Sequence, residues 1–380
     1  MNLRTVALTL AMALWAVSAQ GKLFDDIFVF GDSLSDGGNA YALTGGFPPY
    51  VDPSFTATKR ATNGPTAAEA MATQLGTPVM PSQLGGTNYS VMGAATHAYV
   101  RTDLPDPPAG FPPPPLPAPA KPGSVITNNY VPYGYWYLND YHYGGLAGFE
   151  IDNLTPYGVD KQVEDFLDAP PAQDSSRSLF MIWTGANDFL LGDAAGFLGA
   201  AGNIASFVGA LYDDPGVAAR YFLVPNIPDL AKTPDSLAAF AMLPPDEAAI
   251  QAAQLRGLTE LFNVALAGSL DAVEASRPGM TIVEFDTFSF VDAILADAGA
   301  HGFTNTTEPC VDRNNPAIVC SNPDEYVFWD GFHPSAASHA LIGVAFAGQV
   351  TQTIPEPGTY ALMAAGLVLL VMVRRRAAVH

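Results

Sequence analysis

Short apolar runs bounded by turn residues alternate with stretches of helical periodicity through most of this 380-residue chain. The runs that predict buried strands are 27–30, 178–183, 221–224 and 280–285. The stretches that predict helices are 67–75, 160–167, 247–274 and 336–347. Strands separated by helices indicate a parallel sheet covered on both faces. The predicted fold class is therefore α/β, a three-layer α/β/α sandwich with a central parallel sheet.

The N-terminus departs from this alternation. Residues 1–19 run from Arg4 through an apolar stretch to the small residues Val17-Ser18-Ala19. A basic start, an apolar centre and a small-residue cleavage site are typical of a secretory signal peptide, and a buried N-terminal helix is the alternative. The chain is therefore predicted to be exported.

The C-terminus combines a polar turn, an apolar segment and a basic cluster. Pro355-Glu356-Pro357-Gly358 precedes the segment 360–373, which is followed by arginines at 374–376. As a helix, 360–373 would be about 21 Å long, less than the hydrocarbon core of about 30 Å, so we expect transient membrane insertion. Residues 355–376 resemble the PEP-CTERM sorting signal of Gram-negative exported proteins. The resemblance implies cleavage by a sorting peptidase and a final location in the periplasm, the outer envelope or outside the cell. A plain tail anchor is the alternative.

Export also bears on the two cysteines of the chain. Cys310 and Cys320 are separated by nine residues. Because oxidising compartments favour disulfides, we predict a Cys310–Cys320 bond that closes a loop. A free thiol or a metal-binding role is the weaker alternative.

The charge of the chain argues against polyanionic partners. Acidic residues number 37 against 16 basic ones, which gives a formal net charge of −21. Nucleic acid and anionic membrane surfaces would repel such a protein, so neither is expected as a partner. Most of this acidity is expected to serve solubility.

One segment, residues 101–157, interrupts the alternation of strands and helices. Its first part, 104–122, is so rich in proline that it excludes a helix or a central strand. Aromatic residues follow, and Tyr133, Tyr135 and Trp136 are candidates for binding substrate by stacking on sugars or lining an acyl pocket. Covering an edge of the core is the alternative role.

A hydroxyl group follows the first predicted strand directly. Ser33 lies in a polar turn just past residues 27–30, where an open parallel sheet has its ligand crevice. Some 300 residues later, Asp330 and His333 stand three positions apart. A serine attacks an ester only if a base accepts its proton and a third group orients that base. We therefore predict Ser33 as nucleophile, His333 as general base and Asp330 as its partner.

Two further residues are candidates for stabilising the negative charge that develops on the ester carbonyl oxygen. Asn187 follows the strand 178–183, and its amide can donate to an oxyanion. Gly93 can offer a backbone N–H that no side chain obstructs. Taken singly, Asn187 could instead cap a helix and Gly93 could relieve crowding.

Together these residues resemble the SGNH, or GDSL, family of esterases and lipases. The resemblance rests on the blocks 31–36 with Gly38-Asn39, 88–95, 185–188 and 330–334, and it covers residues 24–349 as one hydrolase domain. It implies a flavodoxin-like sandwich and a triad of Ser33, His333 and Asp330. It also implies an oxyanion hole made by the backbone N–H groups of Ser33 and Gly93 with the Asn187 amide. No metal and no organic cofactor are implied.

The sequence differs in two places from patterns known in related hydrolases. Ser35 occupies the last glycine position of Gly-x-Ser-x-Gly, which excludes the nucleophile elbow of α/β-hydrolases. The insertion 101–157 has no counterpart in the family pattern, so it leaves substrate choice open. The histidines outside the triad form no metal-spaced pair, which leaves a metal-dependent hydrolase with little support.

The predicted function is an exported serine hydrolase that cleaves carboxylic esters through an acyl-Ser33 intermediate. Short-chain acyl or O-acetyl esters, including those on surface polysaccharide, are the first expectation. A lipase or phospholipase acting on longer acyl chains is the alternative within this class. A non-catalytic surface protein that binds glycans on the same scaffold is the alternative of another class.

Overall fold

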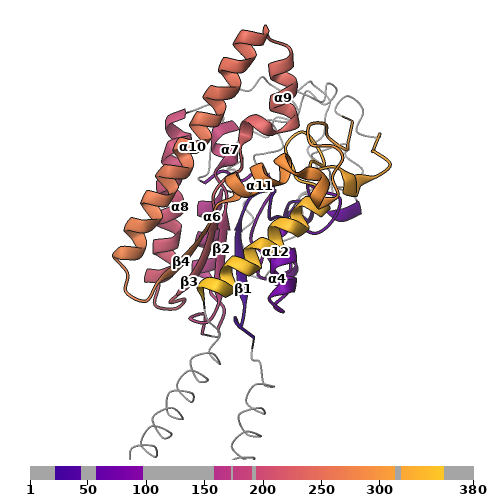
Figure 1. Ribbon diagram of the computed structural model, residues 1–380. Helices are drawn as coiled ribbons and strands as arrows, with labels where there is room; N and C mark the ends of the chain where they lie inside the picture. Colours follow the sequence, from indigo (N-terminus) through magenta and orange to yellow (C-terminus); the bar gives the residue numbers. More distant parts are fainter. Residues whose placement is uncertain are drawn as a thin grey trace, which may run out of the picture.

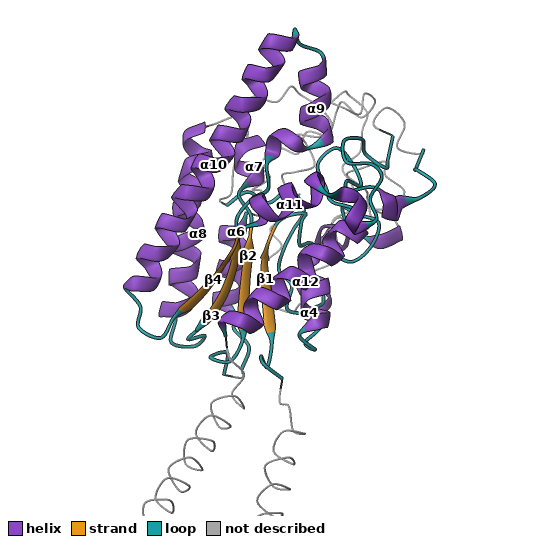
Figure 2. Ribbon diagram, in the orientation of Figure 1, coloured by secondary structure: helices purple, strands orange, loops and turns teal. Residues whose placement is uncertain are grey.

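The central element of the fold is a four-stranded parallel sheet, seen in a computed structural model (Figures 1 and 2). The structure describes residues 22–43, 57–96, 158–172, 174–190, 194–312 and 318–354. The strands are β1 (Ile27–Gly31), β2 (Leu179–Trp183), β3 (Tyr221–Pro225) and β4 (Thr281–Phe285). They lie side by side in the order β1-β2-β3-β4, and each pair is parallel. The predicted parallel sheet is therefore confirmed.

Helices pack on both faces of this sheet and beyond the ends of its strands. They are α2 (Asn39–Leu43), α4 (Ala67–Gln74), α6 (Val159–Asp168), α7 (Ala186–Leu190), α8 (Ala194–Asp213), α9 (Pro234–Ala241), α10 (Pro245–Ala275), α11 (Thr287–Ala296) and α12 (Ala336–Thr353). The four helices predicted from periodicity correspond to α4, α6, α10 and α12. The sequence pattern did not identify α2, α7, α8, α9 or α11.

Alternate residues of each strand enter two separate hydrophobic clusters. In β1, Phe28 and Phe30 face a cluster that includes side chains of α6, α8 and α10. Ile27 and Val29 face the opposite cluster, which includes side chains of α4 and α12. Because successive side chains of a strand point to opposite faces, this partition requires a helical layer on each side. The three-layer sandwich follows from it, with α8 and α10 covering one face and α4 and α12 the other (Figure 1).

Close backbone contact fixes the α4–α12 layer. A Cβ at Gly343 of α12 would lie 2.6 Å from the Ala67 carbonyl oxygen of α4, so only glycine allows this approach. His339, one turn earlier in α12, accepts a hydrogen bond at Nδ1 from the Ala67 N–H at 3.1 Å. Burial lowers the pKa of His339 to about 3, which keeps the ring neutral. His339 is therefore a packing residue in the interior.

A further segment, residues 87–91, pairs with the free side of β1. The Val29 N–H donates to Thr87 O at 3.1 Å, and the Tyr89 N–H donates to Val29 O at 2.7 Å. The chain thus passes from β1 to one side of this strand and later returns to β2 on the other side. Such a switch point opens a crevice at the carboxyl end of the strand, which is where Ser33 follows β1.

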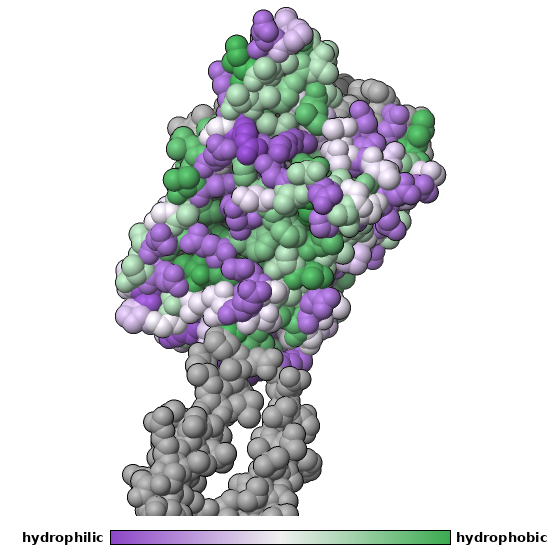
Figure 3. Space-filling view, viewed as in Figure 1, coloured by the Kyte–Doolittle hydropathy of each residue, from purple (hydrophilic) through white to green (hydrophobic). Residues whose placement is uncertain are grey.

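The surface mixes hydrophobic and hydrophilic residues. In Figure 3 hydrophobic residues (green) gather around α11 and α12 near the centre of the view, with hydrophilic residues (purple) beside them. Among the described residues, no helix has both the length and the apolar character needed to cross a membrane. Residues 1–19, the insertion 101–157 and the segment 360–373 lie outside the described residues, so the expectations for them stay predictions.

Candidate active site

The turn that carries Ser33 starts from a tightly constrained glycine. Gly31 ends β1 with a φ of +155°, and a Cβ there would lie 2.2 Å from the Trp183 carbonyl oxygen. The side chain of Gln162, buried in α6, donates from Nε2 to Gly31 O at 2.8 Å and accepts from the Gly31 N–H at Oε1 at 2.9 Å. A larger residue at Gly31 would push β1 from β2, and these two hydrogen bonds hold the strand end in place.

Ser33, His333 and Asp330 form a continuous hydrogen-bonded chain. The Ser33 Oγ lies 2.8 Å from His333 Nε2, and His333 Nδ1 lies 2.7 Å from Asp330 Oδ2. All three residues are largely buried, with exposed fractions of 8 %, 6 % and 8 % for Ser33, His333 and Asp330. If Nδ1 carries a proton toward the carboxylate, Nε2 is free to accept the Ser33 proton. The structure thus brings together the three residues predicted for nucleophilic catalysis.

Backbone contacts hold the loop of Asp330 and His333. Asp330 Oδ1 accepts from the backbone N–H groups of Phe332 at 2.8 Å and His333 at 2.7 Å. The Trp329 N–H donates to His333 O at 2.8 Å and closes the turn. Asp330 therefore orients the imidazole with one oxygen and the loop with the other.

Two contacts tie this loop to the rest of the molecule. The Asp235 N–H, at the start of α9, donates to Gly331 O at 3.0 Å. On the other side, Trp329 packs in a small cluster with Cys310 and Cys320, which form a disulfide. The predicted pairing of these cysteines is therefore present, close in sequence and in space to the Asp330–His333 loop.

Asn187 and Gly93, two of the three predicted oxyanion donors, line the same pocket as Ser33 and His333. Gly93 has a φ of +79°, a left-handed conformation that favours glycine. Asn187 Nδ2 donates to Ala94 O at 3.0 Å. This bond uses one of the two amide hydrogens and leaves the other for a ligand.

A neighbouring carboxylate strengthens the link between these two segments. Asp188, which follows Asn187 in α7, accepts from Thr96 Oγ1 at 2.6 Å and from the Thr96 N–H at 3.0 Å. Thr96 lies three residues after Gly93, so α7 holds the Gly93 loop through two successive side chains. Asp188 therefore has a positioning role, because its contacts with Thr96 hold the segment that carries Gly93.

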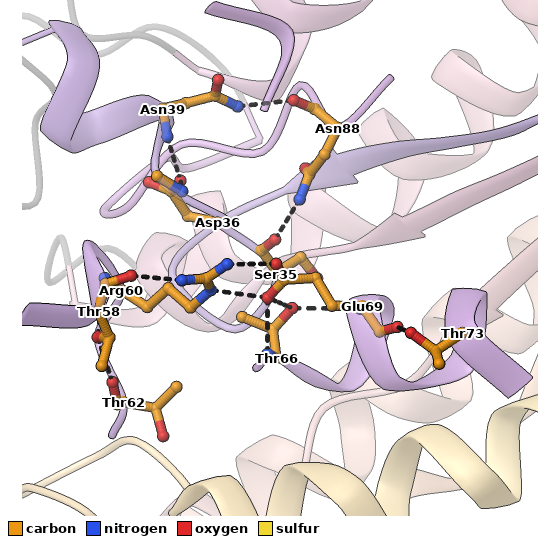
Figure 4. Close-up of polar contacts among 11 residues, drawn as sticks. Ser35, Asp36, Asn39, Thr58, Arg60, Thr62, Thr66, Glu69, Thr73 and Asn88 are labelled. Carbon is orange, nitrogen blue, oxygen red and sulfur yellow. Dashed lines mark hydrogen bonds and ion pairs between the residues drawn. The ribbon is translucent and has the colours of Figure 1, made fainter. Parts of the chain in front are cut away.

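A second network includes Ser35 of the nucleophile turn together with Asp36, Asn39 and Asn88 (Figure 4). Asp36 accepts from the backbone N–H groups of Gly38 at 2.7 Å, Asn39 at 2.6 Å and Met92 at 2.9 Å. Asn39 Nδ2 donates to Asn88 O at 2.7 Å, and Asn88 Nδ2 donates to Ser35 O at 2.7 Å. Burial raises the pKa of Asp36 to about 6, although the backbone hydrogen bonds oppose the shift. The network joins the turn to the segment that leads into Gly93.

Asp32, next to the nucleophile, is a buried acid with an unusual affinity for protons. Burial raises the pKa of its carboxyl from 3.8 to about 7, and the charge of Asp188 acts in the same direction. The Leu34 N–H, which donates to Asp32 Oδ1 at 3.0 Å, and His333 act in the opposite direction. Asp32 is therefore expected to take up a proton near neutral pH, which most aspartates do not.

This shift makes the stability of the protein depend on pH. The folded state binds the Asp32 proton more tightly than the unfolded state, so its ionisation costs stability as pH rises from 3.8 to about 7. We expect Asp32→Asn, which does not titrate, to gain on the order of a few kcal/mol relative to the natural protein between pH 4 and pH 8. Calorimetric melting of both proteins across this range measures the difference. A difference in melting temperature that stays constant with pH would contradict the assignment.

Gln162 could have been identified from the sequence, whereas the predicted substrate-binding aromatic residues lie outside the described ranges. Gln162 occupies a core position in the pattern of Val159, Val163 and Phe166, and a polar residue on such a face is a recognisable signal. Tyr133, Tyr135 and Trp136 lie outside the described residues, so their binding role stays a prediction. The described residues contain no group of three or more His, Cys, Asp or Glu side chains that could bind a metal ion.

Comparisons with known proteins match this chain to one family and to one sorting motif. The model of the GDSL-like Lipase/Acylhydrolase family matches residues 27–346, and that of the PEP-CTERM protein-sorting motif matches residues 353–376. A GDSL esterase/lipase of Arabidopsis thaliana is 24 % identical over 365 residues, 87 % of this chain and 86 % of the relative. The thermolabile hemolysin of Vibrio parahaemolyticus is 25 % identical over 221 residues, 54 % of this chain and 49 % of the relative.

Proposed function

Because the chain belongs to the GDSL-like lipase/acylhydrolase family and is a hydrolase of ester bonds, we propose that it works through a covalent acyl intermediate on Ser33. The observation that carries this proposal is the chain of hydrogen bonds from Asp330 through His333 to Ser33, with distances of 2.7 and 2.8 Å. A serine hydroxyl at hydrogen-bond distance from an oriented imidazole is the arrangement that activates it as a nucleophile.

In the proposed first step, Ser33 Oγ attacks the ester carbonyl carbon while His333 Nε2 takes the hydroxyl proton. Asp330 stabilises the imidazolium that forms. The backbone N–H groups of Ser33 and Gly93 and the Asn187 amide donate to the carbonyl oxygen as it becomes an oxyanion. The C–O bond to the alcohol then breaks, and His333 gives its proton to the departing oxygen.

In the second step, water repeats the attack on the acyl-Ser33 ester. His333 accepts a proton from the water and returns it to Ser33 Oγ as the acid leaves. The proposed steps use no metal and no organic cofactor.

The proposed substrate is a carboxylic ester, and the length of its acyl group is to be tested over a range. Short-chain acyl or O-acetyl esters, such as those that decorate surface polysaccharide, are one end of this range. Longer acyl chains, as for a lipase or phospholipase, are the other. A purely glycan-binding role is not proposed, since the aromatic residues that suggested it lie outside the described ranges.

The PEP-CTERM motif indicates export in a Gram-negative bacterium. We propose that residues 1–19 are removed as a signal peptide and that a sorting peptidase recognises 355–376, with transient membrane insertion of 360–373. The hydrolase would then act in the periplasm, at the outer envelope or outside the cell.

Covalent labelling tests the acyl-enzyme proposal directly. A fluorophosphonate should phosphonylate Ser33 Oγ with loss of fluoride, and peptide mass analysis should place the added mass on the peptide containing Ser33. Labelling should be absent after heat denaturation, since it needs the folded Ser33–His333 pair. An enzyme that hydrolyses esters but carries no label, or carries it on another residue, would disprove Ser33 as the nucleophile.

A further inference from the structure

The pocket that contains Ser33 extends well beyond the catalytic residues. It begins at Ser33, Gly93, Asn187 and His333 and continues between α11 and α12, with a cavity volume of about 120 Å³. At roughly 10–15 Å³ for each water-sized group, this space accommodates about eight to twelve such groups. An acetyl group would leave most of it unfilled.

The lining of this extension is hydrophobic. Its apolar side chains include those of Leu230, Val291, Ile294, Leu295, Phe328 and Ile342. Two hydroxyl groups of the lining are occupied by the main chain: Ser338 Oγ donates to Val327 O at 2.7 Å, and Thr233 Oγ1 donates to Leu230 O at 3.1 Å. The lining therefore favours a hydrocarbon ligand over a hydrated sugar.

Three charged residues of the lining, Asp229, Lys232 and Asp292, form ion pairs. Lys232 Nζ donates to Asp292 Oδ1 at 2.6 Å, and Arg256 Nη1 donates to Asp292 Oδ2 at 3.0 Å. Arg256 also forms an ion pair with the buried Asp229. Because these charges neutralise each other, they do not favour a charged substituent on the ligand.

From these contacts we infer that the pocket holds the acyl chain of the ester and that Val291 in α11 limits the length of chain it accepts. The inference rests on the proposed function, since it assumes that an acyl group is attached to Ser33. The acyl group must remain in place after the alcohol leaves, whereas the alcohol must depart before water can enter. A hydrophobic pocket is therefore better suited to binding the acyl group than the alcohol.

Val291 is well placed for this role. It lies one turn into α11, which follows β4, the strand at the opposite end of the sheet from β1 and Ser33. It packs against the hydrophobic cluster on the α4–α12 side of the sheet, and no catalytic hydrogen bond involves it. A larger side chain at Val291 would fill part of the pocket and leave the triad intact.

The p-nitrophenyl ester series from acetate to palmitate tests the inference. Each buried methylene can raise kcat/KM by up to about fourfold, so with partial burial we expect octanoate to exceed acetate by about tenfold or more. Val291→Phe should lower kcat/KM for octanoate about tenfold and change acetate by less than about twofold. Val291→Ala should shift the preferred chain toward longer esters. Val344→Phe is the matched control, because Val344 lies in α12 and is 51 % exposed.

The results separate this inference from the proposed function. Equal losses for acetate and octanoate in Val291→Phe, or no loss for either, would overturn the role of Val291. If Val291→Phe lowers kcat/KM for octyl acetate relative to ethyl acetate, but does not change the dependence of kcat/KM on acyl-chain length, the pocket binds the alcohol and not the acyl chain.

If the natural protein hydrolyses no ester, the proposed function fails, and calorimetric binding of octanoate to Ser33→Ala then tests the pocket by itself. Octanoate binding should be lost in the double variant Ser33→Ala/Val291→Phe, and retained binding would overturn the inference.

Discussion

Ser33→Ala is expected to lower kcat for ester hydrolysis by about 10⁴- to 10⁶-fold. The substitution removes the proposed nucleophile, and His333 Nε2 loses the hydroxyl that lies 2.8 Å away. The oxyanion donors and the substrate pocket stay in place, so a small residual rate through direct attack by water is compatible with the proposal. Hydrolysis of p-nitrophenyl butyrate, followed at enzyme concentrations high enough to detect the residual rate, measures the loss.

Ser35→Ala provides a matched control two residues away. The Ser35 hydroxyl is buried and has no hydrogen-bond partner among the described residues. The same chemical change at Ser35 should therefore leave kcat within a few-fold of the natural protein. Comparable losses in the two variants would attribute the effect to damage of the turn and not to loss of a nucleophile.

Asp330→Asn is expected to lower kcat by about 10³- to 10⁴-fold with little change in KM. An asparagine amide would donate to His333 Nδ1 in place of accepting from it. The proton of the imidazole would then be on Nε2, and a protonated Nε2 cannot accept the proton of Ser33. The substituted side chain would keep an oxygen for the backbone N–H groups of Phe332 and His333, which Asp330 Oδ1 binds at 2.8 and 2.7 Å. The loop should therefore hold its shape.

Steady-state kinetics and thermal unfolding, measured on the same preparation, check this prediction. Asp324→Asn is a suitable control, because Asp324 is an exposed carboxylate close to the same loop. A large fall in kcat with an unchanged melting temperature would support the tautomer argument. Activity close to that of the natural protein would mean that His333 acts as base without help from Asp330.

The predicted strands have clear patterns in their own sequence segments, whereas α8, which was not predicted, has no such pattern. The four strands were predicted because each is a compact apolar run, and in the structure both faces of the sheet are buried, as such runs require. By contrast α8 contains the glycines Gly196, Gly199, Gly202 and Gly209, which weaken any local helical preference. It is helical because Phe197, Ile204 and Val208 pack into the core. Tertiary packing here overrides local propensity.

The candidate site likewise contains residues that the sequence indicated and residues that it did not. Ser33 and His333 were identified because a serine after a strand and an Asp-x-x-His near the C-terminus occur together with the other candidate residues, whereas each is a weak signal by itself. The roles of Gln162 and Asp188 were not identified. Gln162 stands out as a polar residue on an apolar helix face, but the partners that define the two roles lie 131 and 92 residues away. The raised pKa of Asp32 depends on burial by the whole fold and could not be read from its neighbours in the chain.

The sequence by itself determined the fold class, the order of the strands along the chain and the residue types available for ester chemistry, since each is a local pattern of apolar, turn and reactive residues. Only the tertiary structure decided that Ser33 and His333, 300 residues apart, lie 2.8 Å from each other. It also decided that a hydrophobic pocket adjoins them. The physical reason is that distances, burial and cavity shape arise from packing between segments remote in sequence, which no local pattern specifies.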